Sequence, residues 1–202
     1  MLRTYLLMLL ALAVIIITAC QTKEEESKGT QQNGLIQFNN ARTNQSISLT
    51  IKRQESSPYP LKIQIYDKAN KAIDKVVLLL AFPPDCNVCL PMLTHLNNLG
   101  SRIESLQIIV LTTEHINAKL YHDLLGTQEP NFWLLISNEA LIFDLLDSIK
   151  RGLNIEIRDS KSPFLLLLDK QAQTIQSYEG PILEEILDND ILLLLDSYTN
   201  KE

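Results

Sequence analysis

The sequence of 202 residues predicts an α/β fold, in which a section of β-hairpins precedes a central mixed sheet with flanking helices. Three observations indicate this fold. Short strands with a period of two come first, as in Ile47-Ser48-Leu49-Thr50-Ile51. Beyond Lys75, apolar strands alternate with helical patterns, which is typical of a parallel sheet. Near the carboxyl end, two strands joined by a turn precede a last helix, which predicts an antiparallel hairpin and a covering helix.

The first section, residues 35–74, is predicted to consist of antiparallel strands. We expect strands at residues 35–38, 47–51 and 61–66. The alternation of polar and apolar residues in these strands is typical of a sheet with one face on a core and the other in water. Asp67-Lys68-Ala69-Asn70 then has the composition of a turn.

The predicted core, residues 75–197, begins with a strand that is apolar throughout. Val77-Leu78-Leu79-Leu80-Ala81-Phe82 is short and is bounded by Pro83-Pro84-Asp85, which favours a buried parallel strand. The later elements alternate helices with strands and then change to a hairpin and a helix. In chain order we expect a helix at 86–105, a strand at 106–112, a helix at 114–125, a strand at 132–136, a helix at 138–151 stopped by Gly152, strands at 164–168 and 174–178, and a helix from Pro181 to about Leu195.

Two cysteines, Cys86 and Cys89, stand where the apolar strand ends and the helical pattern begins. The strand therefore delivers them to the carboxyl edge of the predicted sheet. Unpaired N–H groups and the macrodipole at a helix start favour negative charge, so a thiol at the first turn is stabilised as a thiolate. Thiol-disulfide exchange requires a thiolate. The pattern predicts a redox pair.

The chain starts with a segment that is typical of a bacterial export signal. Residues 1–19 hold one charge, Arg3, followed by an apolar stretch, and Ile17-Thr18-Ala19-Cys20 resembles the lipobox, whose cysteine is lipidated and becomes the mature N-terminus. An uncleaved single-span anchor is the alternative, and both place the remainder outside the cytoplasm. Gln21 stands where an aspartate would retain a lipoprotein in the inner membrane of enteric bacteria, so sorting to the outer membrane is allowed, and the choice between inner and outer membrane stays open. Residues 20–34, which are polar after the lipidated cysteine, are predicted to be a flexible tether.

This assignment bears on the cysteine pair. The chain has 3 cysteines, and with Cys20 assigned to lipid only Cys86 and Cys89 remain. A disulfide must then close within the pair. Because bridging a loop of two residues gains little entropy, the pair is predicted to serve exchange and not stability.

Further motifs accompany the pair. Ser162-Pro163 stands directly before the strand at 164–168, and Tyr178-Glu179-Gly180 stands before the last helix. Together with the apolar strand and the cysteine pair, these motifs resemble the TlpA/ResA-type thioredoxin-fold proteins over residues 61–196. That family consists of membrane-tethered thiol-disulfide oxidoreductases. The resemblance implies a thioredoxin-like fold.

The resemblance also implies a role for each site residue. Cys86 corresponds to the attacking thiol and Cys89 to the resolving thiol. Pro163 corresponds to a cis-proline that faces the pair, where the backbone of Ser162 would bind an extended substrate segment. An ordinary trans proline at a strand start is the alternative for Pro163.

Several positions depart from the family. Asp85 stands where family members have a tryptophan, Leu80 where thioredoxins have a buried acid, and Met92 where the cytochrome c maturation proteins have a glutamate. The haem-pathway role therefore lacks its marker. The Asp85 carboxylate opposes the thiolate of Cys86 and tunes its pKa, unless it caps the helix instead. A less stabilised thiolate predicts a reductase.

The sequence thus predicts an extracytoplasmic, lipid-anchored thiol-disulfide oxidoreductase that acts as a disulfide reductase. Its expected partners are protein thiols and disulfides and a membrane thiol electron donor, and it needs no bound cofactor and no metal. A net charge of −6 without a basic cluster argues against nucleic acid.

The alternative is a non-enzymatic thioredoxin-fold lipoprotein that binds copper or acts as a scaffold. His95, His115 and His122 could join the cysteines as copper ligands. However, His95 lies about 240° around the helix axis from Cys89, a poor direction for chelating the same metal.

Overall fold

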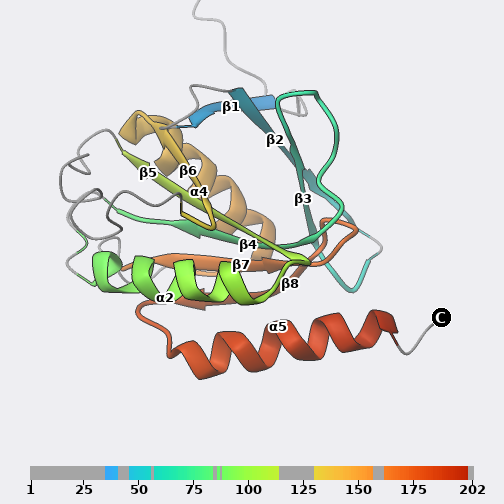
Figure 1. Ribbon diagram of the computed structural model, residues 1–202. Helices are drawn as coiled ribbons and strands as arrows, with labels where there is room; N and C mark the ends of the chain where they lie inside the picture. Colours follow the sequence, from blue (N-terminus) through green and yellow to red (C-terminus); the bar gives the residue numbers. More distant parts are fainter. Residues whose placement is uncertain are drawn as a thin grey trace, which may run out of the picture. The chain divides into compact units, whose positions relative to one another are not determined.

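In the part of the chain that the computed structural model describes, eight strands form one mixed sheet in the order β3-β2-β1-β6-β5-β4-β7-β8 (Figure 1). The described residues are 35–40, 46–55, 57–83, 86, 88–113, 130–156 and 162–199. The elements are β1 (Leu35–Asn40), β2 (Ser46–Arg53), β3 (Leu61–Tyr66), β4 (Val76–Ala81), α2 (Cys89–Arg102), β5 (Leu106–Thr113), β6 (Trp133–Ser137), α4 (Glu139–Leu153), β7 (Phe164–Leu168), β8 (Thr174–Glu179) and α5 (Glu184–Thr199). The predicted export signal, Cys20 and the tether lie outside the described residues.

The first three strands form the predicted antiparallel section. β1 pairs with β2, and β2 with β3, both antiparallel. The turn after β3 is closed by Asp67, whose Oδ1 accepts hydrogen bonds of 2.9 Å from the N–H groups of Ala69 and Lys71. Asn70 in this turn has a φ of 56°, in the left-handed region that asparagine tolerates. The section joins the core through β1, which pairs antiparallel with β6.

The central strands confirm the predicted mixed sheet. β4 pairs parallel with β5, and β5 with β6. β7 pairs antiparallel with β4 and with β8. At the far edges, β3 meets the turn between β7 and β8, where the Ile63 N–H donates to the Ala172 carbonyl at 2.8 Å.

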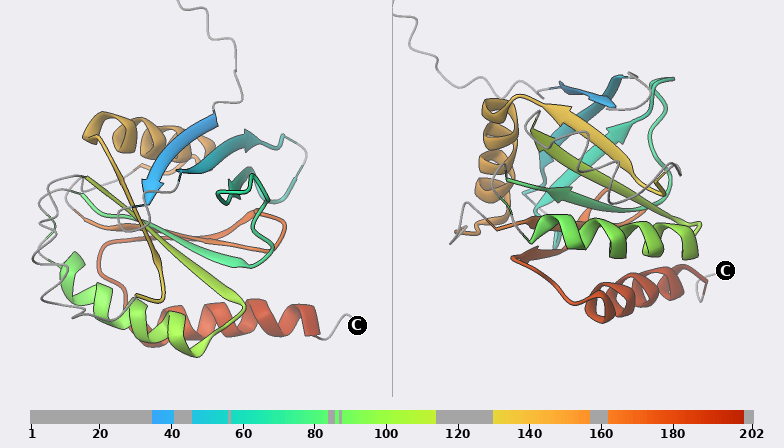
Figure 2. Two further views of the ribbon diagram at one scale, coloured as in Figure 1. Left: turned by 45° about the horizontal axis from the view of Figure 1, so that its top comes forward. Right: turned by 60° about the vertical axis from the view of Figure 1, so that its left-hand side comes forward.

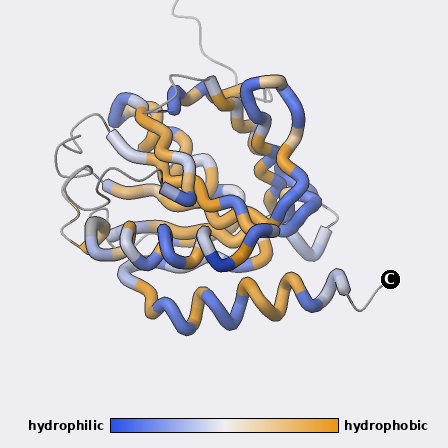
Figure 3. The backbone as a smooth tube through the Cα atoms, viewed as in Figure 1, coloured by the Kyte–Doolittle hydropathy of each residue, from blue (hydrophilic) through white to orange (hydrophobic). Residues whose placement is uncertain are grey.

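The sheet separates two hydrophobic cores. In β4, Leu78 and Leu80 belong to the core under α2 and α5, whereas Val77 and Leu79 belong to the core under α4 and β1–β3. Figure 2 shows α2 and α5 side by side on one face of the sheet and α4 on the other. In Figure 3 the hydrophobic residues run along the central strands, as expected for strands that are buried on both faces.

Helix α4 begins as predicted but ends two residues later. The Asn138 side chain caps it by accepting a hydrogen bond of 2.8 Å from the Leu141 N–H. The helix passes through Gly152 and stops at Asn154, whose φ of 55° is left-handed. Gly152 has another role, since a Cβ at this position would collide with the side chain of Leu61. The predicted stop at Gly152 was therefore wrong.

Helix α5 begins at Glu184, three residues after the expected Pro181, and extends to Thr199. The predicted helix at 114–125 lies outside the described residues. None of the described helices is long and apolar enough to cross a membrane.

Candidate redox site

A disulfide joins Cys86 to Cys89 at the point where the chain passes from β4 to α2. The two Cα atoms are 5.4 Å apart. Cys89 is 1% exposed and belongs to the core under α2 and α5, whereas Cys86 is half-buried at the margin of that core. Cys86 is thus the more accessible residue of the pair, and Cys89 is the buried one.

The helix begins later than the sequence predicts. Its first residue is Cys89, and the N-cap position is held by Val88 without a side-chain hydrogen bond. Pro91 contributes to the later start, because it has no N–H to donate to the carbonyl four residues earlier, so that carbonyl cannot take part in regular helical bonding. Before the helix, the Cys86 N–H donates to the Pro83 carbonyl at 3.3 Å, and the Cys89 N–H donates to the Cys86 carbonyl at 3.4 Å.

This shift changes the electrostatics expected at the pair. The helix dipole acts within the first turn. Cys89 therefore occupies the first helical position, and Cys86 lies just outside it. The disulfide nevertheless holds the Cys86 sulfur against the sulfur of Cys89, so both sulfurs lie at the start of the helix.

The structure brings Pro163 to the same edge of the sheet as the cysteine pair. The last β4–β7 pair is Ala81 with Phe164, so Pro163 lies one step further, beside Phe82. Pro163 is buried and Ser162 is half-buried. The Pro163 carbonyl accepts a hydrogen bond of 2.9 Å from the Gly180 N–H.

The expectation of a cis-proline was wrong. No peptide bond among the described residues is cis, so the Ser162–Pro163 bond is trans. The hydrogen bond from Gly180 to Pro163 extends the β7–β8 ladder by one residue. Pro163 is thus an ordinary proline at a strand start, where the missing N–H is tolerated and the trans form is the preferred one.

The surroundings of Cys89 are apolar. Leu80 is fully buried and Met92 is 7% exposed, so the two positions that depart from the acids of the resembled families are both apolar and buried. Asp85, the predicted pKa-tuning residue, lies outside the described residues. Sequence reasoning missed Thr112, a fully buried residue near the end of β5 whose hydroxyl has no hydrogen-bond partner among the described residues. The only sequence signal was a polar residue at the end of an otherwise apolar strand.

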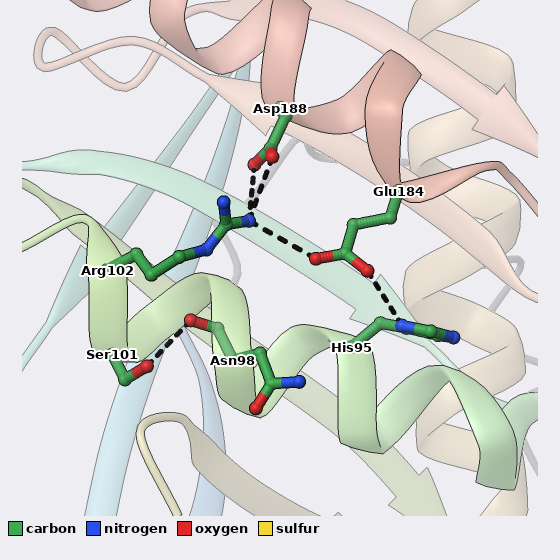
Figure 4. Close-up of polar contacts among 6 residues, drawn as sticks. All are labelled: His95, Asn98, Ser101, Arg102, Glu184 and Asp188. Carbon is green, nitrogen blue, oxygen red and sulfur yellow. Dashed lines mark hydrogen bonds and ion pairs between the residues drawn. The ribbon is translucent and has the colours of Figure 1, made fainter.

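A charged cluster ties α5 to α2, the helix of the cysteine pair (Figure 4). Arg102 Nη2 on α2 lies 2.8 Å from Asp188 Oδ2 and 3.2 Å from Glu184 Oε1. Glu184 Oε2 also lies 2.8 Å from His95 Nδ1. The hydrogen bond to Asp188 and the charges of both acids raise the pKa of Arg102 above its ordinary value. His95 thus pairs with Glu184, an acid of α5. The described residues contain no group of three or more side chains that could hold a metal ion.

Tyr178 of β8 makes a second contact with α5. Its hydroxyl donates to Asp190 Oδ2 at 2.7 Å, from within the core that contains Cys89. Burial, together with this hydrogen bond to a carboxylate, raises the pKa of Tyr178 well above its ordinary range. Helix α5 is thus fixed both to α2 and to β8.

No protein-family model and no curated protein matches this chain. Among solved structures, it is similar to a candidate thiol:disulfide interchange protein DsbE from Chlorobium tepidum, with 13% identity over 80% of this chain and 99% of that chain and a TM-score of 0.47. The exposed lipoprotein thioredoxin Etrx1 from Streptococcus pneumoniae has 12% identity over 66% and 99% of the two chains, with a TM-score of 0.44. A thiol-disulfide isomerase from Corynebacterium glutamicum has 20% identity over 60% and 81%, with a TM-score of 0.44. None of these similarities carries the function, which rests on the cysteine pair itself.

Proposed function

We propose that this protein is a thiol-disulfide oxidoreductase that reduces disulfides in protein substrates through Cys86 and Cys89. One observation carries the proposal. A disulfide closes across two residues between a half-buried Cys86 and a buried Cys89 at a strand-to-helix junction. Such a short bridge adds little stability, so a role in exchange accounts for it better.

The different burial of the two cysteines supports separate roles for them. In the reduced protein, the Cys86 thiolate attacks a substrate disulfide, and one substrate sulfur leaves as a thiolate. Cys89 then attacks the Cys86 sulfur of the mixed disulfide, which re-forms the Cys86–Cys89 bond and releases the second substrate thiol. The substrate gains two electrons, and a thiol donor must return two electrons to the protein before the next cycle.

Insulin reduction with dithiothreitol tests the activity. The wild type is expected to accelerate insulin precipitation, and Cys86→Ser is expected to reduce the rate to that of dithiothreitol alone. Cys89→Ser retains the attacking thiol and should trap partners as mixed disulfides. Trapping by Cys86→Ser and not by Cys89→Ser would reverse the assignment. Inactivity of the wild type, together with cysteine-dependent charge-transfer absorbance on copper titration, would replace the proposal with copper binding.

The direction of electron flow is proposed to be reductive. One feature disfavours a Cys86 thiolate, namely the Asp85 carboxylate next to it in the sequence. A less stabilised thiolate gives a lower potential, nearer that of thioredoxin at about −270 mV than that of DsbA at about −120 mV. Val88 holds the N-cap position of α2, so Asp85 is not the N-cap residue that could have muted its effect on the sulfur.

The Asp85→Asn variant tests this direction. Removing the charge is expected to lower the Cys86 pKa and raise the potential, as measured by thiolate absorbance and by equilibration with glutathione. An unchanged pKa, or a wild-type potential close to that of DsbA, contradicts the reductase assignment and favours an oxidant or isomerase.

The proposed location is outside the cytoplasm, with the protein anchored by a lipid on Cys20 and recharged by a membrane thiol donor. Its support is the sequence of residues 1–20 alone. Mass spectrometry of the mature protein from bacterial membranes should show an N-terminal lipidated Cys20, and Cys20→Ala should release the protein from the membrane fraction if cleavage still occurs. An intact, unmodified N-terminus would identify the single-span anchor instead.

A further inference from the structure

Two adjacent threonines end β5, and both have a buried hydroxyl group without a hydrogen bond to any described residue. Thr112 is 0% exposed and Thr113 is 2% exposed. Within the part of the chain that the structure describes, neither Oγ1 atom has a hydrogen-bond partner. Because buried polar groups in folded proteins nearly always have a partner, each of these hydroxyls calls for an explanation.

The two side chains lie on opposite faces of the sheet. Along β5, Ile108 and Val110 belong to the core that contains Cys89, whereas Ile109 and Leu111 belong to the core under α4. Successive side chains of a strand alternate between faces. Thr112 therefore lies on the face of the cysteine pair, and Thr113 lies on the other face.

Thr112 is also at the correct end of the strand. β4 and β5 are parallel, with Ala81 opposite Leu111, and the Phe82 N–H donates to the Leu111 carbonyl at 2.9 Å. Thr112 is thus beside Phe82, at the edge where the chain continues to Cys86. Because Leu80 on the same face is apolar, the Thr112 hydroxyl is the polar group that β4 and β5 present there.

We propose that Thr112 is a positioning residue that donates a hydrogen bond to the Cys89 sulfur when the pair is reduced. This inference deepens the proposed function and rests on it. When a dithiol reduces the protein, the S–S bond breaks, two electrons and two protons enter the pair, and the dithiol becomes a disulfide. The freed Cys89 sulfur, above all as a thiolate, accepts hydrogen bonds better than a disulfide sulfur. The hydroxyl then gains a partner that it lacks in the oxidised protein, which favours the reduced form.

The equilibrium of the full chain with reduced and oxidised dithiothreitol tests this proposal. Thr112→Val keeps the shape and removes the hydroxyl, and it is expected to shift the equilibrium about three- to tenfold towards the oxidised protein, the effect of one hydrogen bond. Thr113→Val is the matched control, because it removes an equally buried hydroxyl from the other face. Thr113→Val and Thr112→Ser are expected to stay within about twofold of the wild type.

Thermal unfolding provides a second measurement. In the oxidised state both valine variants should gain a similar Tm, because each loses an unsatisfied buried hydroxyl. In the reduced state Thr112→Val should lose this gain and Thr113→Val should keep it. Equal gains in both states, with an unchanged redox equilibrium, would overturn the proposal. Thr112→Ala replaces the valine variant if that variant does not fold.

These results separate the inference from the proposed function. The equilibrium requires only a small dithiol and a reducible Cys86–Cys89 pair. A Thr112-dependent equilibrium in a protein that does not reduce insulin would reject the proposed activity and keep the role of Thr112. A protein that reduces insulin, but whose dithiothreitol redox equilibrium does not depend on Thr112, would keep the proposed activity and reject the role of Thr112.

Discussion

At the scale of single residues, Tyr178 shows how a buried polar contact limits the pH range of the fold. The Tyr178→Phe variant loses the hydrogen bond to the Asp190 carboxylate, and we expect a loss of about 1–3 kcal/mol in the free energy of unfolding at pH 7. The raised pKa of Tyr178 gives the sign of the pH dependence. The unfolded tyrosine ionises near pH 10, so this stabilisation is complete below about pH 10 and is lost as the pH rises further. Urea unfolding should show a steeper alkaline loss of stability for the wild type than for the variant. Parallel pH profiles would contradict this.

The candidate site was only partly predictable from its residues. The apolar run before Cys86 and the spacing to Cys89 were sufficient to place the pair at the edge of the sheet, because both are local signals. The trans form at Pro163 was not predictable in this way, since the residues around Ser162-Pro163 allow either isomer. The role of Thr112 depends on which face of β5 it occupies and on the absence of a partner, and neither property is visible in one segment of sequence.

At the scale of elements, the charged cluster of Arg102, Glu184 and Asp188 is expected to stabilise the packing of α5 on α2. Arg102→Gln should lower the urea midpoint, because it removes the guanidinium that lies between Glu184 and Asp188, two acids four residues apart on α5. The matched control is Arg151→Gln, which breaks the more exposed pair with Asp147 within α4 and should change the midpoint little. The difference between the variants should shrink in 1 M salt, with a Debye length of about 3 Å. Equal midpoints at low salt would show that the cluster does not hold α5.

Gly152 provides a second test, in which helix propensity and packing predict opposite signs. Alanine in the middle of a helix is favoured over glycine by about 1 kcal/mol. However, a Cβ at this position would collide with Leu61 of β3, so we expect Gly152→Ala to destabilise the protein by about 1–3 kcal/mol. In a Leu61→Ala background, the cost of Gly152→Ala should be smaller. A stabilising Gly152→Ala in the wild-type background would show that α4 moves freely relative to β3.

The elements differ in how well the sequence predicts their ends. The strand β7 was predicted to the residue, because a buried apolar run ends where polar turn residues begin. The ends of the helices depend on other causes. Pro91 delays the start of α2, and Asn154, not Gly152, ends α4. Alternation and hydrophobic runs therefore identify elements, whereas hydrogen bonding and tertiary contacts decide where helices stop.

At the scale of the whole described unit, the hairpin section and residues 75–197 share one sheet and the hydrophobic core under α4. The ladder between β1 and β6 is short, with two residue pairs. The core under α4 is nevertheless continuous, because it combines Leu49 of β2 with Leu79 of β4 and Leu145 of α4. Packing across the short ladder predicts that the two sections unfold together.

Trp133, the single tryptophan of the chain, lies in β6 between the two sections and can report on this coupling. We expect urea unfolding followed by Trp133 fluorescence and by far-UV circular dichroism to give one coincident transition. Leu49→Ala empties a fully buried site in the hairpin section and should cost about 2–5 kcal/mol, with both probes shifted by the same amount. The rate at which dithiothreitol reduces the Cys86–Cys89 bond under native conditions should stay unchanged if the redox edge keeps its structure below the transition. The contradicting result would be two separate transitions in Leu49→Ala, with loss of circular dichroism at a lower urea concentration than the change in fluorescence. It would show that residues 35–74 unfold independently and that residues 75–197 stay folded without them.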